Sequence, residues 1–137
     1  MYQVINPESL GAPRGWNHGM LAPTGGRVLF IAGQVGSDET GRVISDDFVE
    51  QFGRALENVL TVVRQAGGDA DSVGRLFILV TSVDAYLASL KPLGVAYRAI
   101  MGRHYPAMCL AGVSRLVDPR AQVEIEALAV IAPEPGS

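Results

Sequence analysis

The chain has 137 residues, of which 48% are apolar and 18% charged, and its net charge is −3. These values are typical of one globular domain, so we expect a single domain over residues 1–137. The 11 Lys and Arg residues form no basic run, which argues against a nucleic-acid-binding protein. One cysteine, Cys109, and two histidines exclude an intrachain disulfide and disfavour a structural metal site.

The termini and the apolar segments give no sign of a membrane protein. No apolar run approaches the roughly 20 residues that a membrane span requires. The first residues, Met1–Asn6, lack the basic start and apolar core of a secretory signal. We therefore expect a cytoplasmic protein that does not associate with membranes.

The first quarter of the chain predicts three strands. Tyr2–Ile5 and Gly19–Ala22 are short β-prone segments, separated by a loop that is rich in glycine. In Arg27–Ala32 the residues after Arg27 are all apolar, so both faces of the expected strand are apolar. This pattern predicts a strand that is covered on both faces. The glycines of Gly33–Gly41 predict a loop after this strand.

A long amphipathic helix is predicted next. Asp47 suits the N-cap, with Glu50 three residues later as its capping-box partner. The helix is expected to run to about Ala66, because Gly67 tolerates the left-handed conformation in which helices end. Its apolar residues recur at helical spacing and form one stripe: Phe48, Phe52, Leu56, Val59 and Val63.

The second half predicts a strand, a broken helical region and two more strands. Arg75–Thr81 is again apolar on both sides. Asp84–Gly102 has helical character, but Pro92 interrupts it, so we expect a short turn and then a main helix from about Pro92. The last two strands are predicted at Met108–Leu116 and Gln122–Ile131, followed by a loose tail at 133–137. The inner face of the main helix is expected to carry Leu93, Tyr97, Ile100 and Met101.

The last strand indicates that one face of the sheet needs a further partner. One side is uniformly apolar: Val123, Ile125, Ala127, Ala129 and Ile131. The other side mixes polar and apolar residues: Gln122, Glu124, Glu126, Leu128 and Val130. Two helices can cover only one face of such a sheet. Oligomerisation is the simplest way to cover the mixed face.

Short motifs match a known family over most of the chain, from about Gly15 to Ile131. They are Ile31–Gln34, Gln51, Ala55–Val59, Ala66–Gly67, Tyr97, Tyr105–Ala107, Val113–Leu116 and Glu124–Ala127. In their joint order and spacing they resemble the RidA/YjgF (reactive intermediate/imine deaminase) family. The resemblance implies an α+β, chorismate-mutase-like fold, in which a mixed six-stranded sheet carries two helices on one face.

The resemblance also implies an assembly and an activity. Three subunits would pack through the other sheet face into a central barrel, with small-molecule clefts between neighbouring subunits. The best-known activity is hydrolysis of reactive enamines and imines, such as 2-aminoacrylate, to 2-keto acids and ammonia. The resemblance implies no cofactor and no metal.

The chain departs from the deaminase pattern where the substrate is usually held. In that branch an arginine follows Pro106-Ala107 and grips the substrate carboxylate as a planar, bidentate donor. Met108 stands there instead, and losing a charge-assisted pair typically costs about 1.5–3 kcal/mol. The segment Leu87–Gly94 is about four residues longer than in the deaminases. Other pocket positions also differ: Trp16 for tyrosine, Ala32 for serine, Gly94 for asparagine and Leu110 for cysteine.

Glu124 is the catalytic candidate, because the resemblance links this carboxylate to positioning or activating the attacking water. The alternative is that Glu124 and Glu126 are ordinary surface or interface carboxylates. The substrate-binding candidates are Trp16, Gly33, Gln34, Tyr105, Met108 and Cys109.

Trp16, Gly33 and Cys109 also have an ordinary structural alternative. Trp16 would stack on a planar ligand or pack at an interface. Gly33 and Gln34 would offer amide groups to a ligand oxygen, or Gly33 would only allow the strand to exit. Tyr105 would donate its hydroxyl. Cys109 lies in an apolar run, which favours a buried, unreactive thiol.

Three functions remain open. The first is hydrolytic deamination of an enamine or imine other than the usual small 2-imino acid. The second is a non-catalytic small-molecule-binding trimer. The third, a nuclease or translation inhibitor, is disfavoured by the acidic balance. An arginine from elsewhere, such as Arg14 or Arg103, could replace the one missing at Met108.

Overall fold

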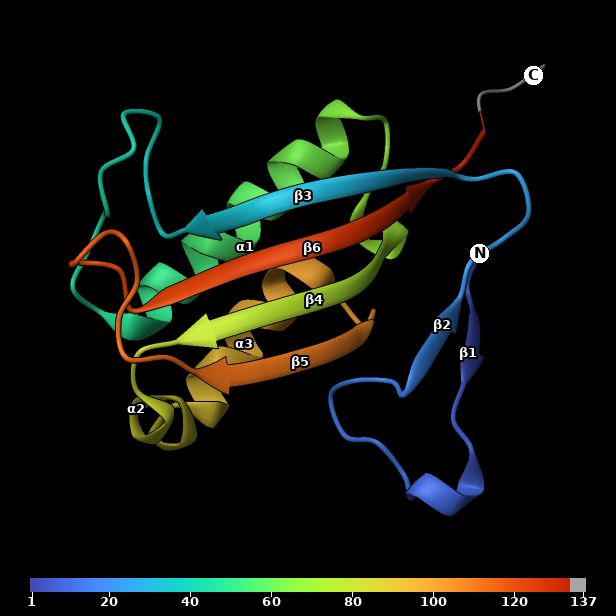
Figure 1. Ribbon diagram of the computed structural model, residues 1–137, viewed down its shortest axis with the longest axis horizontal. Helices are drawn as coiled ribbons and strands as arrows, with labels where there is room; N and C mark the ends of the chain where they lie inside the picture. Colours follow the sequence, from blue (N-terminus) through green and yellow to red (C-terminus); the bar gives the residue numbers. More distant parts are fainter. Residues whose placement is uncertain (134–137) are drawn as a thin grey trace.

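The computed structural model describes residues 1–133; the predicted loose tail at 133–137 lies almost wholly outside the described residues. The fold is α+β, with the helices on one face of a mixed sheet (Figure 1). None of the described helices is both long and apolar enough to cross a membrane. The elements are β1 (Gln3–Ile5), β2 (Gly19–Leu21), β3 (Arg27–Val35), α1 (Phe48–Gln65), β4 (Val73–Val80), α2 (Val83–Ala88), α3 (Leu90–Met101), β5 (Ala107–Gly112) and β6 (Val123–Ile131).

The six strands of residues 1–133 form two sheets, so the expectation of one six-stranded sheet is wrong. β3, β6, β4 and β5 form a mixed sheet in that order, with β4 and β5 parallel. β1 and β2 form a separate antiparallel hairpin. The hairpin is tied to the chain where β4 and β5 begin. Tyr2 donates a hydrogen bond to the carbonyl of Ser72, directly before β4, and Asn17 forms a β-bridge with Ala107, the first residue of β5. The hairpin therefore does not extend the sheet beyond β3 (Figure 1).

Two strands differ from the prediction by several residues at one end. β3 does not end before Gly33: its pairing with β6 shifts between Ile31 and Gln34 and then continues to Val35. A glycine at such a bulge resembles the start of a loop in the sequence. β5 ends at Gly112 rather than Leu116, because its partner β4 ends at Val80, directly opposite.

The predicted helices are confirmed in their main features. The Asp47 side chain accepts a hydrogen bond from the Glu50 backbone amide, and Gly67 adopts a φ of 93° after the helix. The reciprocal half of the predicted capping box is wrong, because the Asp47 backbone amide donates to Ser45 Oγ and not to the Glu50 side chain. All five residues of the α1 stripe are buried. The second helical region divides into α2 and α3 at Ser89, and Pro92 falls in the first turn of α3, where a missing amide is tolerated. Leu93, Tyr97 and Met101 are buried.

The two faces of the sheet differ as the last strand predicts. The apolar side of β6 is buried between the sheet and the helices. The opposite face, which we call the open face, stays uncovered in the single chain. There Val28 is 57% exposed and Phe30 is 79% exposed. The prediction that β3 is covered on both sides therefore does not hold within one subunit.

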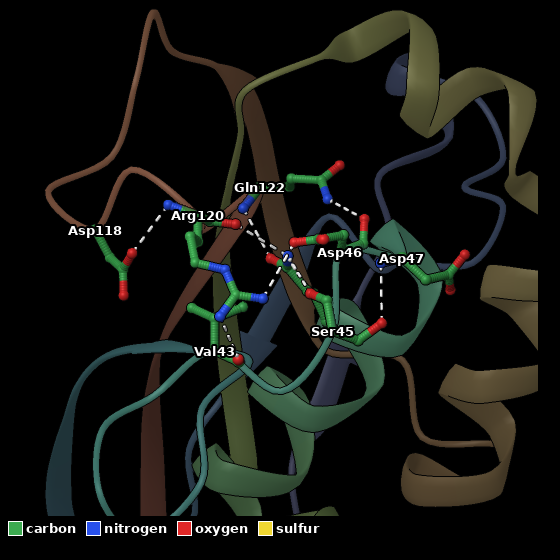
Figure 2. A network of polar contacts seen from close by, with 8 residues as sticks. Val43, Ser45, Asp46, Asp47, Asp118, Arg120 and Gln122 are labelled. Carbon is green, nitrogen blue, oxygen red and sulfur yellow. Dashed lines mark hydrogen bonds and ion pairs between the residues drawn. The ribbon is translucent and has the colours of Figure 1, made fainter.

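A buried amide fixes the start of β6, within the network of polar contacts around Arg120 and Gln122 that Figure 2 shows. Gln51 is fully buried, and its Nε2 donates to the carbonyls of Ser45 at 2.7 Å and Arg120 at 3.0 Å. Its Oε1 accepts from the Gln122 amide at 2.8 Å. The Arg120 guanidinium also donates to the Val43 carbonyl. Together these bonds hold two loops to α1 and fix the chain immediately before Glu124.

Candidate functional site

The predicted site residues lie on opposite faces of the sheet. Met108 is opposite Leu76, which is opposite Ala127, so these three side chains share the helix-covered face. Glu124 is three residues from Ala127, and odd separations along a strand place side chains on opposite faces. It is also displaced by about 10 Å along β6. One subunit therefore cannot bring the Glu124 carboxylate and Met108 into one cavity.

Three of the predicted site residues, Trp16, Tyr105 and Met108, line a cavity of about 700 Å³ on the helix-covered side. The cavity lies between the loop before β2, the strand β5 and the helices α2 and α3. Trp16, Tyr105 and Met108 come from distant parts of the sequence, and the fold brings all three to this cavity. Its other main side chains are Arg14, Tyr86, Leu90, Leu93, Tyr97, Arg98 and Leu110.

Asn17 holds the Trp16 loop against β5. The Asn17 backbone amide donates to the Pro106 carbonyl at 3.2 Å, and the side-chain Nδ2 donates to the Tyr105 carbonyl at 2.5 Å. Trp16 packs edge-on against His18, with ring centroids 4.7 Å apart. The indole is thereby held at the cavity although it is 38% exposed.

Two stacked tyrosines also line the cavity. The rings of Tyr97 and Tyr105 are 5.3 Å apart and nearly parallel. The Tyr97 hydroxyl donates to the His104 carbonyl at 2.6 Å. Burial, with a smaller contribution from Tyr105, raises the pKa of the Tyr97 phenol well above its ordinary value. Tyr97 thus holds the backbone just before Tyr105, whereas no hydrogen bond within residues 1–133 engages the Tyr105 hydroxyl.

Two other predicted site residues, Glu124 and Gly33, lie on the open face, where the Glu124 side chain covers Gly33. A Cβ atom at Gly33 would lie 2.8 Å from the Glu124 carboxyl carbon and 2.9 Å from its Oε1. Only glycine leaves room for the carboxylate in this position. Glu124 is half-buried, and it takes part in none of the ion pairs of residues 1–133. The structure thus pairs two of the predicted residues and leaves the carboxylate available.

The remaining two candidates, Gln34 and Cys109, neither line the cavity nor contact Glu124 over Gly33. The Gln34 side chain donates to the Ala32 carbonyl at 3.3 Å, within its own strand. Cys109 is exposed, so the prediction of a buried thiol is wrong. Its side chain shares the open face with Phe77, opposite it in β4, because neighbours along a strand alternate. The helices cover only the other face of β5, on which Met108 lies.

Sequence reasoning missed several cavity residues, among them Tyr86, Leu90 and Arg98. Arg98 lies one helical turn after Gly94 and lines the cavity together with Leu93 and Tyr97 of the same helix. Arg14 reaches the cavity, as the sequence suggested, whereas Arg103 is not among its lining residues. Within residues 1–133, no three His, Cys, Asp or Glu side chains form a group that could hold a metal ion.

Comparisons with known proteins cover nearly the whole chain. Residues 8–131 match the family described as Endoribonuclease L-PSP. A Rid family protein of unknown function from Yersinia pestis has a solved structure with a TM-score of 0.81 and 32% identity, covering 95% of this chain and 98% of that one. A RutC family protein of Pyrococcus horikoshii is 29% identical over 94% of this chain and 98% of its own. A human 2-iminobutanoate/2-iminopropanoate deaminase is 27% identical over 78% of this chain and 75% of its own.

Proposed function

Because the chain belongs to the RidA/YjgF family, we propose that it hydrolyses an enamine or imine in a cleft between the subunits of a homotrimer. The substrate we propose is not the usual small 2-imino acid, since Met108 replaces the arginine that would hold it. The observation that carries the proposal is the Glu124 carboxylate, which lies over Gly33 and takes part in no ion pair within residues 1–133.

The open face supports an assembly of several subunits. It presents Val28, Phe30, Phe77 and Leu128 along three neighbouring strands. Burying one such side chain typically stabilises by about 1.5–3 kcal/mol, so an uncovered Phe30 favours association. Because Glu124 and Met108 lie on opposite faces, contact between subunits is also the way for the carboxylate of one to approach the cavity of its neighbour.

The chemistry that we propose requires one base and a confined substrate. Glu124 takes a proton from a water molecule as the water oxygen bonds to the imine carbon, and it passes that proton to the nitrogen, which gives a carbinolamine. The C–N bond of the carbinolamine then breaks as the hydroxyl proton is transferred to the departing nitrogen, which yields the ketone and ammonia. One imine and one water give one ketone and one ammonia. Trp16, Tyr105 and Met108 of the neighbouring subunit would form the wall that orients the imine.

The test is ammonia release from a panel of imines, beginning with 2-aminoacrylate and extending to bulkier examples. We expect Glu124→Gln to lower turnover by roughly 100-fold or more, the usual contribution of a general base. Glu126→Gln is the matched control, because this carboxylate lies on the same face two residues away and does not touch Gly33. No turnover above buffer by the wild type on any imine would refute the proposal.

Met108 itself favours a second candidate, a non-catalytic ligand-binding trimer. Without the usual arginine, the cavity could bind a metabolite and leave it unchanged. A ligand screen by thermal shift separates the two candidates. A compound that raises the melting temperature while none of the panel releases ammonia would favour the binding protein.

A further inference from the structure

The cavity lacks an arginine at Met108, but it contains two arginines from other elements. Arg98 comes from α3, and Arg14 comes from the loop before β2. The loop is fixed at the cavity by the hydrogen bonds of Asn17 to the Tyr105–Pro106 backbone. Two arginines therefore line one cavity from two separately anchored segments.

The position of Arg98 depends on Gly94. A Cβ atom at Gly94 would lie 3.1 Å from Arg98 Nη1, and 3.8 Å from both Cζ and Nη2. The guanidinium thus lies over the bare backbone of the preceding turn. A longer side chain at this position, such as the asparagine of the deaminase pattern, would occupy the same space. The glycine and the arginine form a structural pair.

The two guanidinium groups are available to a ligand. Neither Arg14 nor Arg98 belongs to the ion pairs found within residues 1–133. Among residues 1–133, no Asp or Glu lines the cavity, so the formal charges that these residues bring to it are the two positive ones. A guanidinium offers paired donors that match a carboxylate, which makes an anionic ligand the natural occupant.

The rest of the cavity suits an aromatic body. Trp16, Tyr86 and Tyr105 line it together with Leu90 and Met108. Its volume of about 700 Å³ lies in the range of pockets that enclose drug-sized ligands. A three-carbon imino acid would fill a small part of such a space and would touch few of the aromatic walls.

We infer that Arg98, with Arg14, binds the carboxylate of an imino acid that carries an aryl side chain. The anion is held from the helix side instead of from β5, and the aryl group lies among Trp16, Tyr86 and Tyr105. The identity of the ligand as an imino acid depends on the proposed function, whereas the anion site itself does not. The methionine at position 108 then means that the substrate carboxylate binds at a different place in the cavity and that the substrate is larger.

The test measures binding by calorimetry with phenylpyruvate, the 2-keto acid that such an imine would yield. Phenylacetone, in which a methyl group replaces the carboxylate, is the neutral comparison. We expect the wild type to bind phenylpyruvate about tenfold more tightly than phenylacetone, the low end for a charge-assisted pair because both arginines are exposed. Arg98→Met should remove most of this preference. Arg103→Met is the matched control, since it removes the same charge five residues away and outside the cavity lining.

A second variant separates position from charge. Gly94→Asn keeps both arginines but displaces the Arg98 guanidinium, so it should weaken phenylpyruvate binding about as much as Arg98→Met. Three results would each overturn the inference: no binding of phenylpyruvate by the wild type, equal affinity for both compounds, or unchanged preference in Arg98→Met. Anion preference without any imine turnover would support the site and refute the hydrolase. Imine turnover that is insensitive to Arg98→Met would support the hydrolase and refute the anion site.

Discussion

The contact between Gly33 and Glu124 makes Gly33→Ala a sharp test of the proposed base. The added methyl carbon would lie 2.8 Å from the Glu124 carboxyl carbon, whereas such atoms normally approach to about 3.5–4.0 Å. The carboxylate must therefore move by about 1 Å, and a displacement of that size can lower catalysis by about 100-fold. Gly33 is exposed and its φ is not positive, so the fold should tolerate alanine.

Ammonia release and urea unfolding should be measured on the same samples. We expect Gly33→Ala to lose most of its kcat with little change in the free energy of unfolding. Gly53→Ala is the control: its Cβ would meet only Ala96, at 4.0 Å, and replacing a helical glycine should add about 0.5–1 kcal/mol of stability. Full activity in Gly33→Ala would show that the position of the Glu124 carboxylate is irrelevant to turnover.

Two further predictions concern stability. Gln51→Leu leaves the Gln122 amide and the Ser45 and Arg120 carbonyls without their partner, so the free energy of unfolding in urea should fall by at least about 2 kcal/mol; an unchanged midpoint would contradict the role of this network. The raised pKa of Tyr97 means that the folded state keeps its proton when the unfolded state loses it. Stability should therefore decline as the pH rises above about 10, and the advantage of the wild type over Tyr97→Phe should be smaller at pH 11 than at pH 9.

The sequence predicts best where a periodic pattern coincides with a chemical signal at its ends. The α1 helix is such a case, because its apolar stripe, the Asp47 cap and the Gly67 stop all specify the same segment. The buried side of β6 is another, since strict alternation has one interpretation. These features are local, and residues near in sequence determine them.

Features that depend on distant partners were predicted less well. The glycine at position 33 reads as a loop, although it accommodates a carboxylate from β6 and lies within a continuing strand. The separation of the β1–β2 hairpin depends on its bonds to Ser72 and to Ala107, far along the chain. Nothing in the sequence marks Arg98, because a lone arginine on a helix resembles any solvated charge. Its significance comes from Gly94 and from the cavity that α3 shares with β5.

In the proposed mechanism, Glu124 of one subunit acts on a substrate held in the cavity of its neighbour. This arrangement is tested most directly by mixing two inactive variants, Glu124→Gln and Met108→Trp, the second of which fills the cavity. If mixed trimers assemble at random, about a quarter of the interfaces combine an intact carboxylate with an open cavity. We predict recovery of about that share of wild-type ammonia release. A mixture that exchanges subunits but remains inactive would contradict a shared site.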